Sequence, residues 1–486
     1  MADDPVAALL GRLSGAAPIR THISEVYVGA EVALKRRRPV RLTFLDFSTP
    51  EARRRFAERE VALNAPHAPG LYRGVRAVTR EADGRLALDG RGEAIDWVVE
   101  MAALPAGAFL DHVAAQGRLT DPLLDGIADA VASMHRALPA PDAGLALRDL
   151  ETVARDNLRA ARAAGMDAPR CQAWLDACLA ALAARHPSLC ARAAAGRVRR
   201  CHGDLHLGNM VLLGQRPVPF DALEFDEQLA SIDTGYDLAF LLMDLDRRVS
   251  RAAANRVLNR YVARTGDAGL LSGLAPWLSL RAFIRAHVAA ARGDAAEAGR
   301  YLAAAEEYLA PAPAVLVAIG GLQGTGKSTL ARALAPALGA APGALVARSD
   351  EIRKFLAGVA PETRLPAAAY TVAASGTVYA AILEQARLAL GAGHAAIADA
   401  MFQHPDERRA IEAAAGGSRF VGLWLEVPQA LAEARLAARQ GDASDADAAV
   451  LRESAVRDPG PVTWHRIDAT DRGRAEATAR RLLTSA

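Results

Sequence analysis

The stretch VLVAIGGLQGTGKSTL, residues 315–330, decides the fold class of the C-terminal part of the chain. It opens on a short β-branched run, which is typical of a buried strand in a parallel sheet. Residues 321–328 then fit the pattern G-x-x-x-x-G-K-[ST], and a helical pattern follows them. A strand, a glycine-rich loop and a helix in this order predict a phosphate cradle, because backbone N–H groups and the helix N-terminus converge on phosphate oxygens.

A lysine in this loop supports the interpretation. Only three of the 58 Lys+Arg residues are lysines, so each is a candidate for a role that a planar guanidinium cannot fill. Lys327 is one of them, and we expect it to reach the β- and γ-phosphates while the hydroxyl of Ser328 binds Mg²⁺. The loop residues predicted to contact the nucleotide are Gly321, Gly324, Thr325, Gly326, Lys327, Ser328 and Thr329.

Strands and helices alternate after this loop, which predicts an α/β domain with a parallel sheet. The further strand candidates are ALVAR (344–348), HAAIADA (394–400) and FVGLWLEV (420–427). Side chains at the carboxyl ends of such strands face the ligand crevice. We therefore expect Asp350 to accept the proton of a substrate hydroxyl and Arg353 to steady the transferring phosphoryl group. The alternative for Asp350 is that it is an ordinary capping residue of an amphipathic helix. Asp399, which ends a strand, would hold Mg²⁺ through water.

Two arginines precede the acidic loop GDASDAD (441–447). Arg435 and Arg439 are four residues apart on a predicted helix, so they could belong to a mobile lid that closes on phosphate. In a chain so rich in arginine, exposed surface residues are an equally good interpretation.

A second group of polar residues lies in the sequence HGDLHLGN (202–209), which fits H-x-D-x-x-x-x-N. Kinase-like phosphoryl transfer needs one Asp that accepts the hydroxyl proton, and an Asn and a second Asp that hold Mg²⁺. Asp204, Asn209 and Asp221 are predicted to fill these roles. A zinc site at His202 and His206 is disfavoured, because a third well-placed ligand is missing.

An upstream lysine completes this second group. VALK (32–35) is predicted to be a strand whose Lys35 contacts the nucleotide phosphates and pairs with a helix glutamate. The helix predicted over 49–64, with Thr49 as N-cap, offers Glu58 and Glu60, of which we prefer Glu60. Backbone groups of Glu100 and Met101 could meet an adenine edge. The alternative for Lys35, within a KRRR run, is a solvated basic turn.

These motifs resemble two known families. Residues 315–486 resemble the P-loop kinases of the zeta-toxin and polynucleotide-kinase group, on the D-x-x-R that begins at Asp350 and on DAMFQHPDERR (399–409). The resemblance implies that Asp350 is the general base and that Arg408 or Arg409 lies near the substrate.

Residues 20–300 resemble the aminoglycoside phosphotransferase family, which shares the protein-kinase fold, on the HGD form of the first motif and on DTGYDLA (233–239). In this resemblance Asp237 has a structural role. Nearly the whole chain resembles bacterial proteins that fuse an aminoglycoside-phosphotransferase-like domain to a P-loop ATP-binding domain. The similar stretches are THIS (21–24), RPVRLTFLDFST (38–49), HGDLHLGN (202–209) and DASDAD (442–447).

The expected fold class is therefore α/β and α+β. A bilobal protein-kinase-like domain is predicted over 1–310, with an N-lobe at about 20–103 and a C-lobe at about 104–310. A P-loop kinase domain is predicted over 311–486, after the linker-like APAPA (310–314).

The expected function is a bifunctional phosphotransferase that uses ATP or GTP with Mg²⁺, acts on small hydroxyl-bearing metabolites and could perform two successive steps. The alternatives are an aminoglycoside-type antibiotic kinase, a 5′-hydroxyl nucleic-acid kinase, and an enzyme in which one domain is a non-catalytic ATP-binding regulator. A net charge of +2 makes a nucleic-acid partner unlikely. An acidic start, no long apolar run and four cysteines without a C-x-x-C pair predict a cytoplasmic protein with buried thiols and no membrane span. The oligomeric state stays open.

Overall fold

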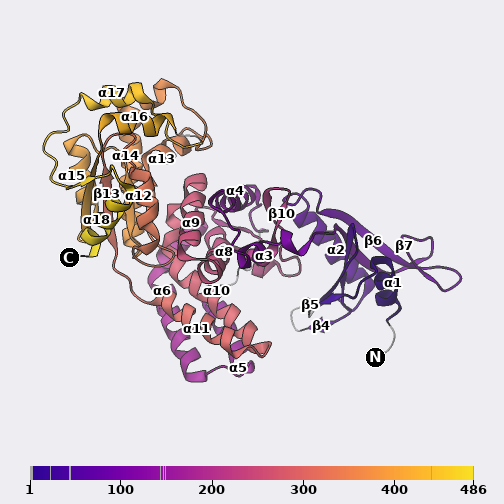
Figure 1. The fold of residues 1–486 in the computed structure, drawn as a ribbon. Helices are drawn as coiled ribbons and strands as arrows, with labels where there is room; N and C mark the ends of the chain where they lie inside the picture. Colours follow the sequence, from indigo (N-terminus) through magenta and orange to yellow (C-terminus); the bar gives the residue numbers. More distant parts are fainter. Residues whose placement is uncertain are drawn as a thin grey trace. The chain divides into compact units, whose positions relative to one another are not determined.

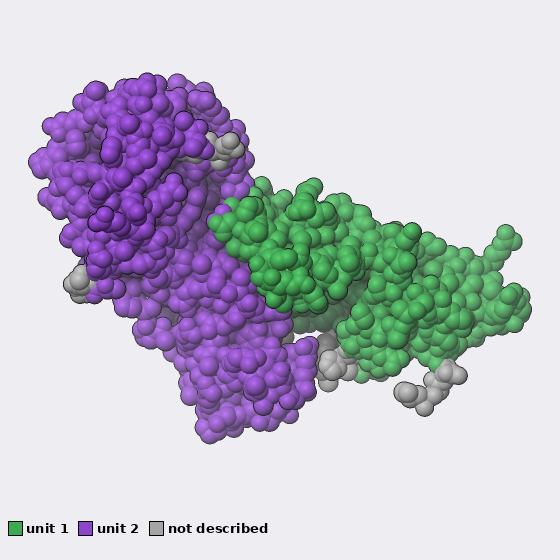
Figure 2. Space-filling view, in the orientation of Figure 1, with its two compact units in different colours: residues 1–148, 198–237 green, residues 149–197, 238–486 purple. Residues whose placement is uncertain are grey.

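The computed structural model describes residues 4–21, 23–42, 45–142, 144–145, 147, 149–438 and 441–484. The chain divides into two compact units (Figure 1). Unit 1 comprises Met1–Arg148 and Val198–Asp237, and unit 2 comprises Asp149–Arg197 and Leu238–Ala486 (Figure 2). In the described part of the chain, no helix combines the length and the apolar character that a membrane span needs.

Unit 1 contains a six-stranded antiparallel sheet in the order β1-β2-β3-β8-β6-β7. Its strands are β1 (Ile19–Arg20), β2 (Ser24–Val28), β3 (Val32–Arg37), β6 (Tyr72–Arg80), β7 (Leu86–Leu88) and β8 (Glu93–Ala102). Side chains alternate between the two faces of a strand. On β3, Leu34 therefore packs with the apolar residues of helix α1 (Pro5–Ser14), whereas Ala33 packs with those of helix α2 (Pro50–Asn64). Lys35 shares the α2 face with Ala33.

Helix α2 begins as its sequence predicts. Pro50 occupies the first turn, and the hydroxyl of Thr49 accepts a hydrogen bond from the N–H of Ala52 at 3.1 Å. Helix α1 was not predicted from the sequence. The side chain of Asp4 caps it, and Val6, Leu9 and Leu10 are buried on the sheet.

The rest of unit 1 is built from short elements that hold the polar segments between them. The hairpin β10–β11 and the pair β12–β9 flank the residues of the HGD motif and those around Asp221. The elements are β4 (Arg41–Leu42), β5 (Leu45–Asp46), α3 (Leu110–Ala115), α4 (Asp121–Ala137), β9 (Val198–Arg200), β10 (Met210–Leu213), β11 (Arg216–Pro219), α7 (Glu227–Ala230) and β12 (Ser231–Asp233). Helix α8 (Thr234–Arg248) begins in unit 1 and continues into unit 2.

The first part of unit 2 is helical. It contains α5 (Leu150–Ala163), α6 (Ala168–Ala194), α9 (Arg251–Thr265), α10 (Leu271–Ala291) and α11 (Ala295–Leu309). The ring of Trp174 stacks on Phe283 with centroids 3.5 Å apart, and its indole N–H donates to the hydroxyl of Ser279 at 2.9 Å. The cysteines are free thiols, and three of them are buried as expected, but Cys190 is exposed, which corrects that expectation for this residue.

The second part of unit 2 is a five-stranded parallel sheet in the order β14-β15-β13-β16-β17. Its strands are β13 (Val315–Gly320), β14 (Leu345–Arg348), β15 (Ala396–Asp399), β16 (Arg419–Glu426) and β17 (His465–Asp468). The helices are α12 (Lys327–Leu334), α13 (Ser349–Leu356), α14 (Val372–Gly391), α15 (Pro405–Ala414), α16 (Gln429–Ala437), α17 (Ala448–Ala455) and α18 (Arg472–Thr484). The predicted fold class is confirmed for both parts of the chain.

Strand β13 lies at the centre of this sheet, and all six of its residues are buried. One face of the sheet packs against α12 and α18. The chain passes from β13 to β14 and β15 on one side, and then to β16 and β17 on the other. Ligands bind at such a switch point, at the carboxyl ends of the strands. The sheet therefore places the loop 321–328 where a nucleotide would bind.

The buried His394 gives unit 2 an acid-sensitive position. Its side chain is fully buried, neither ring nitrogen has a hydrogen-bond partner among the described residues, and burial lowers its pKa to about 4. From pH 6.5 down to about pH 4 the unfolded chain binds a proton that the folded chain does not, so stability falls as the pH falls.

We expect the free energy of unfolding to decrease by about 3 kcal/mol over this window because of His394 alone. His394→Leu should remove this part of the pH dependence, measured as the urea midpoint between pH 7.5 and pH 4. His465→Leu, at an exposed position, is the control. Parallel pH profiles for the wild type and His394→Leu would contradict the prediction.

Candidate functional site

A network of charged side chains joins strand β3, helix α2 and the segment around residue 221 in unit 1. The ammonium group of Lys35 contacts Glu60 at 2.9 Å and Asp221 at 2.5 Å. Burial by itself would lower the pKa of Lys35, but the charges of Asp221 and Glu60 outweigh it and raise this pKa above its usual value. Glu58 pairs with Arg54 on the exposed side of the helix instead. Lys35 is therefore held as an ammonium at the point where three elements meet.

A second basic residue of β3 stabilises the same glutamate. Two positions after Lys35, Arg37 projects from the same face of the strand, donates to Glu60 at 2.7 Å and pairs with Glu224. Burial raises the pKa of Glu224, although the charge of Arg37 opposes this shift. Sequence analysis did not identify Arg37 as a site residue; the available signal was its spacing of two from Lys35.

The HGD motif and Asp221 provide the oxygen-bearing side chains of unit 1. The amide nitrogen of Asn209 donates to the backbone oxygen of Asp204 at 2.9 Å and to its carboxylate at 3.0 Å. The side chain of Asp204 is 46% exposed, so it is accessible to a substrate. Asp221 has a φ of +61°, which is rare for a residue other than glycine and is typical of functional positions. Its backbone N–H donates to the hydroxyl of Tyr72 at 3.1 Å.

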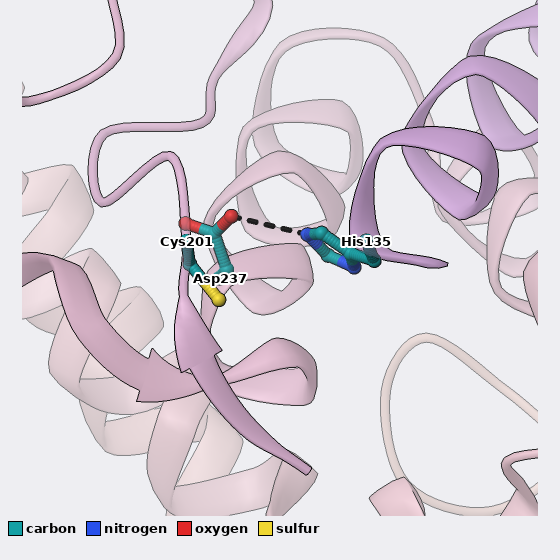
Figure 3. Close-up of side chains that lie close together, drawn as sticks. All are labelled: His135, Cys201 and Asp237. Carbon is teal, nitrogen blue, oxygen red and sulfur yellow. Dashed lines mark hydrogen bonds and ion pairs between the residues drawn. The ribbon is translucent and has the colours of Figure 1, made fainter. Parts of the chain in front are cut away.

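The carboxylate of Asp237 fixes the backbone of the HGD motif. It accepts hydrogen bonds from the N–H groups of Gly203 at 2.9 Å and His202 at 3.2 Å. The ring of His135 contacts the same carboxylate at 3.1 Å (Figure 3). His135, Cys201 and Asp237 are the one group of potential metal ligands found close together among the described residues. The carboxylate is already engaged by N–H donors, and the thiol of Cys201 donates to the backbone oxygen of Ile232, so we interpret the group as a structural brace.

Asp237→Asn tests this brace. Both carboxylate oxygens of Asp237 accept hydrogen bonds, whereas an amide replaces one of these oxygens with an NH₂ group, which cannot accept. At least one N–H of residues 202–203 therefore loses its acceptor. Each such loss costs about 1–3 kcal/mol. We expect the free energy of unfolding of the variant to fall by at least about 1 kcal/mol, measured as the denaturant midpoint at constant m-value. An unchanged midpoint would show that the carboxylate is not required.

Strand β8 holds the two residues predicted to meet an adenine edge. Glu100 and Met101 are paired with β3 on one side and with β6 on the other, and Glu100 also pairs with Arg76 at 3.2 Å. The sheet therefore already occupies the backbone of this stretch. The contact of Glu100 and Met101 with an adenine edge stays a prediction.

In unit 2, the loop after β13 has a backbone that only glycine adopts without strain at two critical positions. Gly321 and Gly324 have φ angles of +129° and +77°. A Cβ would lie 2.5 Å from the oxygen of Leu425 at the first position and 2.6 Å from that of Ala432 at the second. The ammonium group of Lys327 donates to the carbonyl oxygens of Gly321 at 2.9 Å and of Leu322 at 2.8 Å. The side chain of Lys327 thus lies over its own loop, at which it is predicted to bind nucleotide phosphates.

The other nucleotide-binding candidates of the loop lie beside it. Gly326, with a φ of +96°, precedes α12, and Ser328 and Thr329 belong to its first turn. The hydroxyl of Thr325 donates to the oxygen of Leu322 at 2.8 Å. Together these residues form the glycine-rich loop and helix start that the motif predicts.

Arg348 connects the carboxylates at the end of β14 and was missed by sequence analysis. It is buried, and its guanidinium lies 3.7 Å from Asp350, 3.8 Å from Asp399 and 2.5 Å from Asp442. Burial by itself would lower the pKa of Arg348, but Glu351 and these three carboxylates raise it above its usual value. The sequence signal that could have identified Arg348 is its position, because it is a basic residue at the end of a predicted strand and directly before S-D-x-x-R.

Arg353 and Arg435 both donate to backbone oxygens, and Arg435 lies beside the glycine-rich loop; their predicted contacts with phosphate stay predictions. Arg353 donates to the oxygen of Ala369 at 2.7 Å and lies over the ring of Tyr370 at 4.8 Å, so it supports residues 367–370. Arg435 donates to the backbone oxygens of Thr470 at 2.9 Å and of Thr325 at 3.4 Å. Its predicted partner Arg439 lies outside the described residues.

The two arginines of the 399–409 segment have different surroundings. Arg408 is buried and donates to the carbonyl oxygens of Phe402 and Pro459, both at 2.7 Å, so it stabilises backbone. Arg409 is exposed and pairs with Asp406.

The third lysine of the chain, Lys354, anchors the acidic loop 441–447. It is buried, and its ammonium contacts Asp445 at 2.5 Å and the oxygen of Thr363 at 2.5 Å. Asp445 also accepts from the hydroxyl of Tyr370 at 2.6 Å. Together with the ion pair between Arg348 and Asp442, this contact holds the loop on β14 and α13.

The oxygen donors of both units fit Mg²⁺, which prefers hard oxygen ligands. In unit 1, Asn209 turns its amide nitrogen to Asp204, so its amide oxygen and the carboxylate of Asp221 are the groups that would hold a cation. In unit 2, the buried Asp399 has a carboxylate oxygen without a hydrogen-bond partner among the described residues, and Ser328 lies in the first turn of α12. Asp399 and Ser328 are thus the candidates there.

Two family models match separate stretches of the chain. A family model described as "Phosphotransferase enzyme family" matches residues 101–277, and one described as "AAA domain" matches residues 316–457. Among solved structures, a gluconokinase from Sinorhizobium meliloti 1021 is 22% identical, with 36% of this chain and 95% of that chain covered and a TM-score of 0.26. The Plasmodium vivax ethanolamine kinase Pv091845 is 11% identical, with 59% and 80% covered and a TM-score of 0.38.

Relatives of similar length match almost from end to end. The uncharacterized proteins Rv2004c of Mycobacterium tuberculosis and Mb2027c of Mycobacterium bovis are each 30% identical over 469 residues. The matches cover 92% of this chain and 91% of each relative. The chain therefore belongs to the same family as these mycobacterial proteins, and it joins a domain of the phosphotransferase enzyme family to a P-loop domain of the AAA type.

Proposed function

We propose that the protein is a bifunctional phosphotransferase that uses ATP or GTP with Mg²⁺ and phosphorylates small hydroxyl-bearing metabolites. The observation that carries the proposal is the arrangement in unit 1, where Lys35 is paired with Glu60 and Asp221 while Asp204 and Asn209 are hydrogen-bonded to each other. These are the parts that kinase-like phosphoryl transfer requires. The two sites are assigned to domains 1–310 and 311–486.

In the first site, Asp204 orients the acceptor hydroxyl and takes its proton as the oxygen attacks the γ-phosphorus. The bond between that phosphorus and the β–γ bridging oxygen breaks, and the nucleoside diphosphate leaves. Lys35 neutralises charge on the nucleotide phosphates, and Glu60 fixes its position. Bound Mg²⁺ would neutralise further phosphate charge at Asn209 and Asp221. Most of the rate gain then comes from positioning and charge stabilisation.

In the second site, Lys327 and the N–H groups of its loop bind the phosphates, and Asp350 acts on the acceptor hydroxyl. Asp350 lies in the first turn of α13, two residues after β14 ends, and Arg348 holds it near Asp399. We assign this domain to the zeta-toxin and polynucleotide-kinase group on its D-x-x-R. The covalent fusion supports two successive steps on one metabolite.

The test is nucleotide consumption with Mg²⁺ across a panel of metabolite alcohols and their phosphates, for the wild type, Asp204→Ala and Asp350→Ala. Two working kinases predict that each variant loses a different part of the activity. If Asp350→Ala leaves every phosphorylation intact, the P-loop domain is a regulator and the bifunctional assignment fails. If the product accepted by one site is not a substrate of the other, the successive-step assignment fails.

A further inference from the structure

Strand β14 is an edge strand of the P-loop sheet. It pairs with β15 on one side, and among the described strands none pairs with its other side. An uncovered edge exposes backbone N–H and C=O groups and invites pairing with another chain. Helix α9, which precedes the P-loop domain in sequence, packs on this edge and on α13 within unit 2.

Two asparagines of α9 bind the backbone of β14, and we call them the asparagine clamp. The amide oxygen of Asn259 accepts from the N–H of Val346 at 2.7 Å, and its amide nitrogen donates to the oxygen of Ala344 at 3.2 Å. Asn255 donates to the same oxygen at 3.0 Å. The whole chain has only five asparagines, and two of them are used here.

The pattern of these bonds is that of a parallel β-ladder. In such a ladder, a residue of one strand lies opposite residue i of its neighbour. It donates to the carbonyl oxygen of residue i−1 and accepts from the N–H of residue i+1. Asn259 makes this pair of bonds around Leu345 with its side-chain amide alone. At the start of β14, the clamp therefore satisfies the carbonyl of Ala344 and the N–H of Val346 as a sixth strand would.

Further contacts fix α9 and its neighbours to the P-loop domain. Arg260 and Arg264 pair with Glu362 at 2.7 Å and 3.1 Å. On α6, Arg185 donates to the carbonyl oxygens of Gly391 at 3.0 Å and Ala392 at 2.9 Å, at the end of α14. Charged groups of the helical part are thus bound at two separate places of the P-loop domain.

The clamp lies next to the predicted acceptor side of the P-loop site. Val346, which Asn259 binds, is two residues before Arg348 and four before Asp350. We propose that helix α9 serves as the missing edge strand of the P-loop sheet and that Asn259 is a positioning residue, which through β14 places Arg348 and Asp350 for phosphoryl transfer. This inference rests on the proposed function in its claim about Asp350, and on geometry alone in its claim about the edge.

The test uses the full chain with Asp204→Ala, so that nucleotide turnover reports the P-loop site. Asn259→Asp keeps the size of the side chain and the acceptor for Val346, but it sets a carboxylate oxygen against the oxygen of Ala344. Asn259→Ala removes both bonds. The matched control is Asn157→Asp on α5, whose amide contacts His287 at 3.1 Å within the helical part.

Three quantities are measured: kcat and KM for hydrolysis of Mg-ATP, and hydrogen exchange of the peptide that contains Val346. For Asn259→Asp we expect kcat to fall about tenfold or more with KM for ATP within about twofold, because β13 and its loop are not touched. For Asn259→Ala we expect exchange at Val346 to become at least about tenfold faster. The Asn157→Asp control should match its parent in all three.

Each outcome separates the two claims. Unchanged exchange in Asn259→Ala overturns the edge-strand claim. A kcat and KM for Asn259→Asp equal to those of its parent overturn the positioning claim. If the Asp204→Ala parent hydrolyses no ATP at all, the proposed function of the P-loop site is wrong, whereas faster exchange in Asn259→Ala still supports the edge strand.

Discussion

Asp204→Ala should lower kcat of the kinase-like site by about 10²- to 10⁴-fold, while KM for the nucleotide changes little. The carboxylate is 46% exposed and held by Asn209 at 3.0 Å, so it is accessible to the acceptor hydroxyl that we propose for it. The substitution leaves the ion pairs of Lys35 with Glu60 and Asp221 in place, so we expect the proposed contacts of Lys35 with the nucleotide to persist.

Steady-state kinetics with a substrate found in the metabolite panel measure this effect. Asp204→Asn is the variant of matched size, and it should lose nearly as much activity because a neutral amide cannot accept the hydroxyl proton. Asp350→Ala is the control, since it changes the other predicted site. An Asp204→Ala enzyme that retains more than about a tenth of kcat would show that another group is the base.

Lys327→Ala is expected to reduce nucleotide turnover at the P-loop site by at least about 10²-fold. Its ammonium now donates to the oxygens of Gly321 and Leu322, and nucleotide phosphates would replace these acceptors. Hydrogen bonds to charged groups are worth about 1.5–3 kcal/mol each, so losing two of them corresponds to about a hundredfold or more. The expected loss appears in both KM and kcat, since the lysine binds the nucleotide before and during transfer.

The measurement is Mg-ATP hydrolysis and nucleotide affinity in the Asp204→Ala background. Lys327→Arg should also be impaired, because a wide guanidinium does not fit a position shaped for a compact ammonium. Arg332→Ala is the control, because it removes a positive charge from the exposed side of the same helix, α12. Nucleotide affinity and turnover that are equal in the Asp204→Ala parent and after the added Lys327→Ala would place the phosphate site elsewhere.

Local patterns in the sequence anticipated the helix start at Thr49, the strand β13 and the parallel order of the strands that follow it. Each depends on neighbouring residues: a capping hydroxyl before a proline, or a β-branched run before glycines. Strand β17 was not anticipated, because only Ile467 of its four residues is buried and no pattern distinguishes it from a loop.

For the candidate sites, sequence spacing indicated residue types and the tertiary structure decided their partners. Glu60 was preferred over Glu58 on the helix, and the structure pairs Glu60 with Lys35. Whether Asp204, Asp350 and the other site residues perform the predicted chemistry stays a prediction. For Arg353, the structure shows contacts to residues 367–370 that no local pattern contains.

By itself the sequence determined that the chain carries a glycine-rich phosphate loop and an H-x-D-x-x-x-x-N motif, since both are short and their chemistry needs specific residues at fixed spacing. Only the tertiary structure decided that Arg348 meets Asp399 and Asp442, that Lys354 reaches Asp445 across 91 positions, and that Asn259 covers the edge of β14. Such contacts join residues that are distant in sequence, and the burial that makes them strong exists only once the sheet and the helices have packed.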